Sequence, residues 1–388
     1  MGAVMTRHLG SSSFLTPAAM LLCASTIVAV PATAEAAPAP VPDQRIRLTA
    51  PAGDVVRSAT VDLAGKTWAR ARGATRTVSL ETDRFSMVGA TWQGRAPHLQ
   101  VRTRHEGGWT TWRHADPMAD AGAVAGSRRA AELLWVGDSR AIQVRTSANA
   151  ARDLELVLID PGHLPSDRAT TAPVSSRTSA KQRSRPTSAP APKLRTRTQW
   201  GANDNWRNGE PRYNRTVKQV HVHHTATGNT YKRVDVPGIL RGMYRYHTQT
   251  LGWFDIGYNF LVDKFGRAWI GRSGGPYRVV QGAHTLGFNV QSVGIAVIGN
   301  LDERRPWHKA VVTVAKLAAW KLDGYDRMAK STVRMRSTGS DKYAKGRRVR
   351  LPVIDGHRDT NDTACPGEYL YARLPEIRNR SQRRINRW

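Results

Sequence analysis

Residues 166–193, with the sequence SDRATTAPVSSRTSAKQRSRPTSAPAPK, contain almost no large apolar side chain. A stretch this rich in Ser, Thr, Ala, Pro and Arg cannot bury enough apolar surface to offset the entropy lost on ordering. We therefore expect a disordered basic Pro/Ser/Ala linker over 166–193. It would divide the 388-residue chain into two folding units, in line with a usual domain size of about 100–200 residues.

The N-terminus has the order of charge and apolarity that is typical of an export signal. A basic start precedes an uncharged apolar stretch over 14–30, and small residues follow, with A-x-A cleavage choices at Ala34 or Ala36. We expect residues 1–36 to be a signal peptide and the protein to be secreted, either extracellular or cell-wall associated. A membrane span needs about 20 apolar residues, so a stable membrane anchor is not expected. Cys23 would leave with the signal.

The charge balance is strongly basic, because 59 Lys and Arg residues face 30 Asp and Glu residues and leave a formal net charge of +29. In an exported chain, such a charge favours polyanions of the cell envelope as partners, and we expect anionic wall polymers to be among them. The alternative is a nucleic-acid-binding protein, but the sequence carries no nucleic-acid-binding motif. We therefore expect no nucleic acid partner.

The first folding unit, residues 43–165, reads as all-β. Short alternating or β-branched runs such as RFSMVGATW, HLQVRTR and LELVLID are separated by Gly, Pro and Asp, which predicts a β-sandwich-like domain. EGGWTTW indicates a hairpin tip. We find no catalytic constellation here, and the role of this domain is not readable from the sequence. Four tryptophans would line a glycan site or, as we favour, pack in the core: Trp92, Trp109, Trp112 and Trp135.

The second unit, residues 194–388, mixes strand and helix patterns. KQVHVHHTA alternates as a strand, SVGIAVIGN is a continuous apolar run typical of a strand buried on both faces, and IGYNFLVDKFGRAWIGR indicates a hairpin. DVPGILRGMYRYHTQT and WHKAVVTVAKLAAWKLDGY have helical spacing. We expect an α/β domain with a central mixed sheet flanked by helices.

Once Cys23 is removed, Cys365 is the single cysteine of the mature chain. It would be an inert buried thiol, a nucleophile or a metal ligand. Strand periodicity places His221 and His223 on one face of VHVHHTA and His224 on the other. One strand histidine, a distant histidine and Cys365 would make a His₂Cys set, which suits zinc and leaves a fourth position open. Spacing alone does not choose between His221 and His223.

Four motifs together resemble a known family. VHVHHTA, GWFDIGYNFLVDKFGRAWIGR, GAHTLGFNVQSVGIAVIGN and GHRDTNDTACPG occur in the order and rough spacing of the zinc-dependent N-acetylmuramoyl-L-alanine amidases. Within that family they are most similar to the branch shared by phage-type amidases and peptidoglycan recognition proteins. The resemblance covers about residues 195–380. A signal, a β-rich front domain and a basic linker resemble the layout of secreted actinobacterial amidases.

The resemblance implies a zinc site and two catalytic residues. His223, His357 and Cys365 match the family's three zinc ligands, which favours His223 over His221. Tyr258 matches an active-site tyrosine whose hydroxyl would bond to the zinc water or to the developing oxyanion. Thr363 matches a position that is lysine in phage members and threonine in many recognition-protein amidases. A related branch needs a glutamate on the strand SVGIAVIGN, where this chain has Ala296 instead.

The resemblance also implies substrate contacts, because His284, Asn289 and Arg272 match positions of a groove that contacts muramyl peptide. An arginine there would pair with a stem-peptide carboxylate. Asp355 or Asp359 would orient His357 from behind, and the sequence does not choose between them.

The function implied is hydrolysis of the amide bond between N-acetylmuramic acid and L-alanine in peptidoglycan. The partners would be peptidoglycan and muramyl peptides, and the cofactor would be Zn²⁺. The leading alternative is a recognition protein that binds muramyl peptide without cleaving it, but non-catalytic members typically lose the cysteine that this chain keeps as Cys365. A zinc endopeptidase that cuts stem peptides is a further alternative, disfavoured only by the family resemblance.

Overall fold

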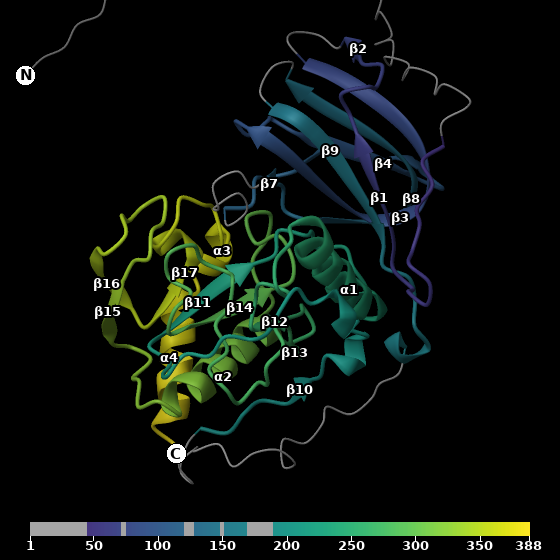
Figure 1. Ribbon diagram of the computed structural model, residues 1–388. Coiled ribbons are helices and arrows are strands. Elements are labelled where there is room, and N and C mark those ends of the chain that lie inside the picture. The colour runs from purple at the N-terminus through teal and green to yellow at the C-terminus, as the bar shows by residue number, and fades with distance from the viewer. Residues whose placement is uncertain (1–44, 71–74, 120–127, 148–150, 169–188) are drawn as a thin grey trace, which may run out of the picture. The chain divides into compact units, whose positions relative to one another are not determined.

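The computed structural model describes residues 45–70, 75–119, 128–147, 151–168 and 189–388 (Figure 1). The expected signal peptide lies outside the described residues, and so does the middle of the expected linker, 169–188. Among the described residues, no helix has both the length and the apolarity needed to cross a membrane. All of these residues belong to one compact unit that runs from Ala39 to Trp388.

The N-terminal domain is a β-sheet, which confirms the expected all-β class. Within the described ranges, nine strands join in the order β1-β9-β3-β8-β4-β5, with β2 and β7 paired to β3 and β6 paired to β4. Register shifts within β3 between Glu81 and Met87 interrupt its pairing with β8, and such irregularities bend a strand. The expected sandwich-like domain is thus built on one continuous ladder. Its strands are β1 (Arg57–Asp62), β2 (Ala69–Arg70), β3 (Thr75–Gly94), β4 (Gln100–His105), β5 (Gly108–Trp109), β6 (Arg113–His114), β7 (Arg129–Ala130), β8 (Leu134–Ser147) and β9 (Ala151–Asp160).

The apolar run LELVLID in β9 is buried on both faces. Leu156 and Leu158 join the core of the N-terminal domain, together with Trp92. The alternate residues Val157 and Ile159 point the other way. They join a cluster with residues of α1 (Val236–Arg245), a helix of the C-terminal domain. A strand that is apolar on both sides needs a cover on each. One face of this sheet therefore packs within its own domain and the other against the C-terminal domain.

The four tryptophans of the N-terminal domain divide into two pairs. Trp92 and Trp135 are buried, as expected for core packing. Trp109 and Trp112 are half-buried, and arginine side chains stack on them, with the Arg102 guanidinium 4.8 Å from the Trp112 ring centre. The expected hairpin tip is present, because His105 in β4 pairs with Gly108 in β5.

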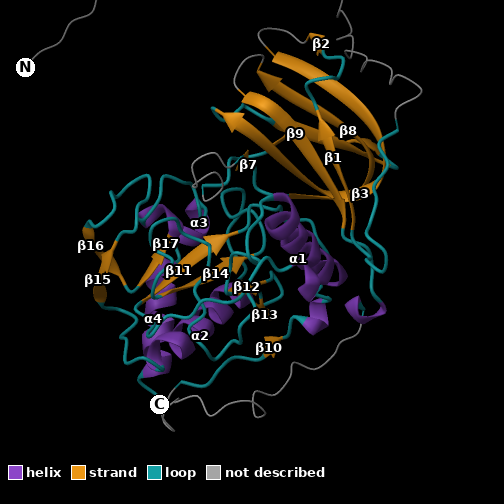
Figure 2. Ribbon diagram, in the orientation of Figure 1, coloured by secondary structure: helices purple, strands orange, loops and turns teal. Residues whose placement is uncertain are grey.

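The C-terminal domain is built on a mixed sheet, which confirms the expected α/β class (Figure 2). The strand order is β10-β13-β12-β14-β11-β17, and only β12 and β13 run antiparallel. Its strands are β10 (Leu194–Arg195), β11 (Gln219–His224), β12 (Phe260–Val262), β13 (Ala268–Ile270), β14 (Ser292–Val297) and β17 (Ile354–Gly356). The remaining elements are a π-helical turn, η5 (Tyr246–Thr250), the helices α2 (His308–Asp323), α3 (Glu368–Tyr371) and α4 (Leu374–Ile385), and a hairpin of β15 (Thr332–Arg336) and β16 (Arg348–Pro352).

The two faces of this sheet have different neighbours. Val220 and Val222 of β11 pack in the core formed with α2 and α4. His221 and His223 alternate with these valines, so they project from the opposite face. On that face, Leu261 and Trp269 belong to the cluster that includes α1. The alternation of β11 therefore places His221 and His223 between the sheet and the α1 side of the domain.

The described ends of the expected linker are packed against the C-terminal domain. Asp167 closes a short 3₁₀ turn, η1 (Pro165–Asp167), and is buried. At the other end, Ala189 is buried in the core with α2, and its amide donates to Asp323. Residues 166–168 and 189–193 of the segment expected to be disordered are therefore part of the described fold.

Arg241 of α1 joins the two domains through a buried ion pair. Its guanidinium donates two hydrogen bonds to the Asp167 carboxylate, at 2.8 and 2.7 Å, and only 1% of Arg241 is exposed. Further donors bond to the carbonyls of Pro161, Gly162 and Trp200. Because Arg241 and Asp167 are both buried, removing one partner would leave a buried charge uncompensated.

We predict that Arg241→Met lowers the free energy of unfolding by about 3–5 kcal/mol, the usual cost of breaking a buried ion pair. Urea unfolding measures the change. Arg45→Met is the matched control, because its ion pair with Asp83 leaves 57% of the arginine side chain exposed. That control should cost less than about 1 kcal/mol. Equal losses in the two variants would contradict the structural role of Arg241.

Candidate metal centre

His223, His357 and Cys365 converge at the carboxyl ends of β11 and β17. His223 lies near the end of β11, His357 follows β17 directly, and Cys365 comes from the loop after it. All three are buried, and one nitrogen or sulfur atom of each lies within 4.8 Å of the others. Among the described residues, this is the group of three that could hold a metal ion. The structure thus brings together the three residues that the family resemblance selected.

The geometry of this group fits zinc. The Cys365 sulfur lies 3.6 Å from Nδ1 of His223. In a tetrahedral site with Zn–S of about 2.3 Å and Zn–N of about 2.0–2.1 Å, two such ligand atoms stand about 3.5 Å apart. Burial, and next the neighbouring His357, lower the pKa of His223 well below its usual value, so the imidazole is neutral as a ligand must be. The donor set therefore matches zinc in chemistry and in spacing.

His221, the competing candidate on the same strand face, is occupied elsewhere. Its Nδ1 lies 2.6 Å from Oδ1 of Asp355, and Gln219 donates to the second carboxylate oxygen at 2.7 Å. All three residues are fully buried. Burial raises the pKa of Asp355 to about 6, an effect that His221 opposes. The neighbouring strand thus supplies a partner that holds His221 away from the metal group.

Asp359, the second carboxylate considered as a partner for His357, makes two other contacts. It accepts hydrogen bonds from the Tyr371 hydroxyl at 2.6 Å and from the Gly356 amide at 2.8 Å. The second of these closes the 3₁₀ turn that begins at His357. Asp359 therefore shapes the backbone that carries His357.

His284 lies behind His223 rather than in an open groove. Its Nδ1 is 3.1 Å from Nε2 of His223, and only 1% of the residue is exposed. The ring fills the space over two glycines, Gly282 and Gly294, where a Cβ atom would come within 2.3 Å of it. The expected substrate contact is therefore not available to the buried ring in this conformation. The two glycines and His223 fix its place.

Asn289 and Arg272 also make contacts within the protein. The Asn289 side-chain oxygen accepts from the amides of His284 and Thr285, at 2.8 and 3.1 Å, so it closes the turn that carries His284. Arg272 donates to the carbonyl of Ile256 at 3.1 Å and lies over the Phe254 ring. Burial lowers the pKa of Arg272 to about 10. Both residues shape the surroundings of the site, and neither joins the metal group.

Tyr258 and Thr363 lie next to the metal group. The half-buried Tyr258 ring has its centre 5.4 Å from that of His223. The Thr363 hydroxyl oxygen accepts a hydrogen bond from the Cys365 amide at 3.2 Å, which fixes the backbone of that ligand. Thr363 therefore supports the loop directly, a role that sequence reasoning did not assign to it.

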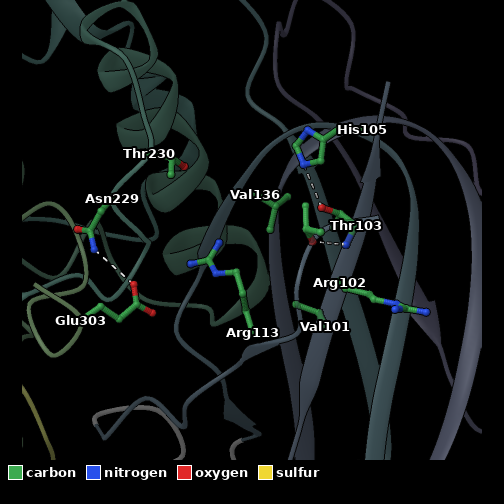
Figure 3. Close-up of a pocket in the computed structure, with 10 residues that line it drawn as sticks. Val101, Arg102, Thr103, His105, Arg113, Val136, Asn229, Thr230 and Glu303 are labelled. Atoms are coloured by element: carbon green, nitrogen blue, oxygen red, sulfur yellow. Dashed lines mark hydrogen bonds between the residues drawn. The ribbon is translucent and has the colours of Figure 1, made fainter. Parts of the chain in front are cut away.

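The N-terminal domain contacts the loop that follows β11, the strand that carries His223. The sequence did not predict this contact. The Trp135 amide donates to the Thr227 carbonyl at 2.7 Å, and Arg113 donates to the Trp135 carbonyl at 2.7 Å. Arg113 lines a cavity of about 340 Å³ that β4 forms with Asn229 and Glu303. Figure 3 shows the residues around this cavity. None of the predicted site residues lines this cavity. No sequence signal links positions so far apart in the chain.

Comparison with known proteins places both halves of the chain. Residues 213–368 match the family described as N-acetylmuramoyl-L-alanine amidase, and residues 38–191 match the family described as Rv3811 N-terminal galactose-binding domain-like. N-acetylmuramoyl-L-alanine amidase of Homo sapiens is 36% identical over 132 residues, which are 34% of this chain and 19% of the human one. The solved structure of wild-type Drosophila PGRP-LB aligns with 47% of this chain and 91% of its own, at 28% identity and a TM-score of 0.37.

Peptidoglycan-recognition protein SC2 of Drosophila simulans is 31% identical over 150 residues, which are 39% of this chain and 68% of that protein. The family match over 213–368 includes the strand β11 and all three residues of the candidate metal group. The relationship suggested by the four sequence motifs is thereby confirmed. The chain belongs to the N-acetylmuramoyl-L-alanine amidase family that includes the peptidoglycan-recognition proteins, and its function concerns peptidoglycan.

Proposed function

We propose that this protein is a zinc-dependent amidase that hydrolyses the bond between N-acetylmuramic acid and L-alanine in peptidoglycan. The observation that supports this proposal is the buried group of His223, His357 and Cys365. Many members of a recognition family bind muramyl peptide without cleaving it, and a binding protein has no need of a thiolate beside two imidazoles. The spacing of 3.6 Å between Cys365 and His223 favours the catalytic alternative.

Different residues would bind the metal, stabilise the oxyanion and support the ligand loop. His223, His357 and Cys365 would hold the metal, and bound zinc supplies a Lewis acid together with a water whose pKa is near neutrality. Tyr258, beside the His223 ring, would donate its hydroxyl hydrogen to the oxyanion that forms on the scissile carbonyl. Thr363 would keep the ligand loop in place and offer a weaker second donor.

We also propose a positioning role for His284, in place of the substrate contact first expected. The contact between its Nδ1 and Nε2 of His223 leaves Nδ1 of His223 facing Cys365. A metal-bound histidine usually has such a partner on its other nitrogen, and the partner fixes which nitrogen faces the metal. His284 would therefore act on the metal through His223.

Export to the wall is the setting that this activity requires. Residues 1–36 would serve as the signal, which stays a prediction because they lie outside the described residues. The substrate would be peptidoglycan or muramyl peptides released from it. Hydrolysis of a soluble muramyl peptide by the purified mature chain, followed by chromatography of the released peptide, tests the proposed function directly.

We predict that Cys365→Ser loses most of the metal and most of the activity, because the thiolate is one of three ligands. Elemental analysis should find about one zinc per wild-type chain and much less in the variant. Added zinc should raise the melting temperature of the wild type alone, since the folded state assembles the site. A variant with full zinc and full turnover would exclude Cys365 as a ligand.

For Tyr258→Phe, we expect an intact, metal-loaded protein whose turnover falls by about 10²–10³, the effect of losing one oxyanion donor. Zinc content and melting temperature should stay close to the wild type, because no ligand and no apolar area is lost. KM should hold, since an interaction made mainly in the transition state lowers kcat. Tyr213→Phe, at an exposed tyrosine, is the control and should change nothing. Unchanged turnover in Tyr258→Phe would assign the ring to packing.

His284→Ala separates the positioning role from substrate contact. Loss of a hydrogen-bonded partner behind a metal ligand typically weakens metal binding about 10–100-fold. A competition titration against a zinc-binding dye measures this affinity without reference to turnover. If the zinc affinity is unchanged and KM rises, His284 contacts substrate and the positioning role is wrong.

A further inference from the structure

The β15–β16 hairpin has one apolar face and one arginine face. Met335 and Leu351 are buried and pack on Phe288. The residues that alternate with them are exposed arginines: Arg334, Arg336, Arg348 and Arg350. The apolar face follows from strand alternation, and its buried side chains anchor the hairpin to the domain. Alternation does not explain why every outward position between Thr332 and Pro352 on the paired strands is an arginine.

The register of the hairpin sets these arginines against each other. Arg334 lies directly opposite Arg350, and Arg336 lies opposite Arg348. Like charges at opposed positions of an antiparallel pair destabilise the pairing. Within the described part of the chain, none of the four forms an ion pair with an acidic side chain. The hairpin therefore carries a repulsion that its own fold leaves uncompensated.

A cavity of about 530 Å³ opens beside this arginine face. It lies between β15 and the loop that carries Gln291, and no acidic side chain of the described residues lines it. The exposed Thr338 adds a hydroxyl donor at the same place. The cations that line the cavity are Lys218, Arg334, Arg336, Lys345 and Arg348, and we call this set the basic cavity.

Two other basic regions of the described structure are partly balanced. Around α4, Arg380 bonds to Glu376 at 2.7 Å, and Arg384 donates to the Pro190 carbonyl at 3.0 Å. The cavity in Figure 3 includes Glu303 opposite Arg113, which itself bonds to backbone carbonyls. The basic cavity differs from both because, among the described residues, no acidic side chain pairs with any of its five cations. A bound anion would supply a partner for them.

The chemistry of the basic cavity favours a phosphate polymer. The planar guanidinium of arginine donates paired hydrogen bonds that match a phosphate group. Successive outward residues of a strand stand about 7 Å apart, so Arg334 and Arg336 form a row suited to a repeating anion. Single-stranded nucleic acid is recognised by stacking its bases on aromatic rings, and no aromatic residue lines this cavity. We propose that the basic cavity binds a phosphodiester polyanion without bases, such as a polyol-phosphate chain.

The basic cavity shares no lining residue with the metal group, but the hairpin that forms it contacts the loop that carries two of the proposed ligands. At the tip of the hairpin, Ser340 donates to the Thr360 carbonyl at 2.9 Å, and Asp341 accepts from Asn361 at 3.1 Å. These contacts tie the hairpin to the loop between His357 and Cys365. A polymer held in the basic cavity would tether the protein without contacting His223, His357 or Cys365, none of which lines that cavity.

The test compares two variants with the same change in net charge. Arg334→Gln/Arg336→Gln/Arg348→Gln removes three charges from the basic cavity. Lys316→Gln/Arg383→Gln/Arg387→Gln removes three charges near α4 and serves as the control. Fluorescence anisotropy with labelled poly(glycerol phosphate) of fixed length measures affinity. We expect the cavity variant to bind at least about tenfold more weakly, the effect of losing one charged hydrogen bond, and the control to stay close to the wild type.

Three results would overturn the proposal. Equal weakening in both variants would mean that net charge alone attracts the polymer. A single-stranded DNA oligonucleotide that binds more tightly than poly(glycerol phosphate) would indicate a nucleic-acid surface. Polyglutamate that binds equally well would remove the preference for phosphate. The melting temperature of the cavity variant should hold or rise, because opposed like charges are removed. Its hydrolysis of a soluble muramyl peptide should be unchanged, which separates this test from that of the proposed amidase activity.

Discussion

The pleat of β11 determines the position of each part of the candidate site. Val220 and Val222 must face the core formed with α2 and α4, so His221 and His223 must face the other way. A shift of one residue in register would move the histidines into an apolar core and the valines to the site. The parallel partners β14 and β17 on either side hold this register. The apolar side of the strand thereby orients the polar side.

The residues around β11 then give His221 and His223 different partners. Asp355 on β17 binds His221, while Gly294 on β14 leaves room for the His284 ring behind His223. The loop after β17 brings His357 and Cys365 to the remaining side of His223. Buried polar groups need partners, and here each buried imidazole of the strand face has one. The arrangement holds His223 in a single orientation toward Cys365.

The N-terminal domain is part of the same core, although the sequence suggested two separate units. Gly242 of α1 approaches Met87 of β3 so closely that a Cβ atom would lie 2.2 Å from the sulfur. In the same region, the Tyr246 hydroxyl lies 3.0 Å from the main-chain carbonyl oxygens of both Ala90 and Ala131, and it donates its hydrogen to one of them. With the Arg241–Asp167 pair, these contacts make the front domain a structural support for the ligand strand. The loop after β11 depends on it through Trp135.

The sequence predicted most elements, because the patterns on which they depend are local. The hairpin of β12 and β13, the buried strand β14 and the helix α2 all lie within the segments expected from periodicity. Contacts between distant segments were not predictable in the same way. LELVLID shows that β9 is apolar on both faces, but it does not say that α1 covers the second face. His284 matched a groove position by motif, and only the fold shows that its ring is buried behind His223. The arginines of the hairpin contributed to a large net charge in the sequence, and their concentration around one cavity depends on strand register.

The central claim is that the chain cuts one particular bond, and mass spectrometry of digested peptidoglycan tests it most directly. Purified wall material treated with the mature, zinc-loaded protein should release stem peptides that begin with L-alanine. The remaining glycan should carry free lactyl groups on its N-acetylmuramic acid residues. Products cut within the stem peptide would contradict the account and indicate an endopeptidase. Undigested wall in the presence of bound protein would indicate a recognition protein that does not cleave.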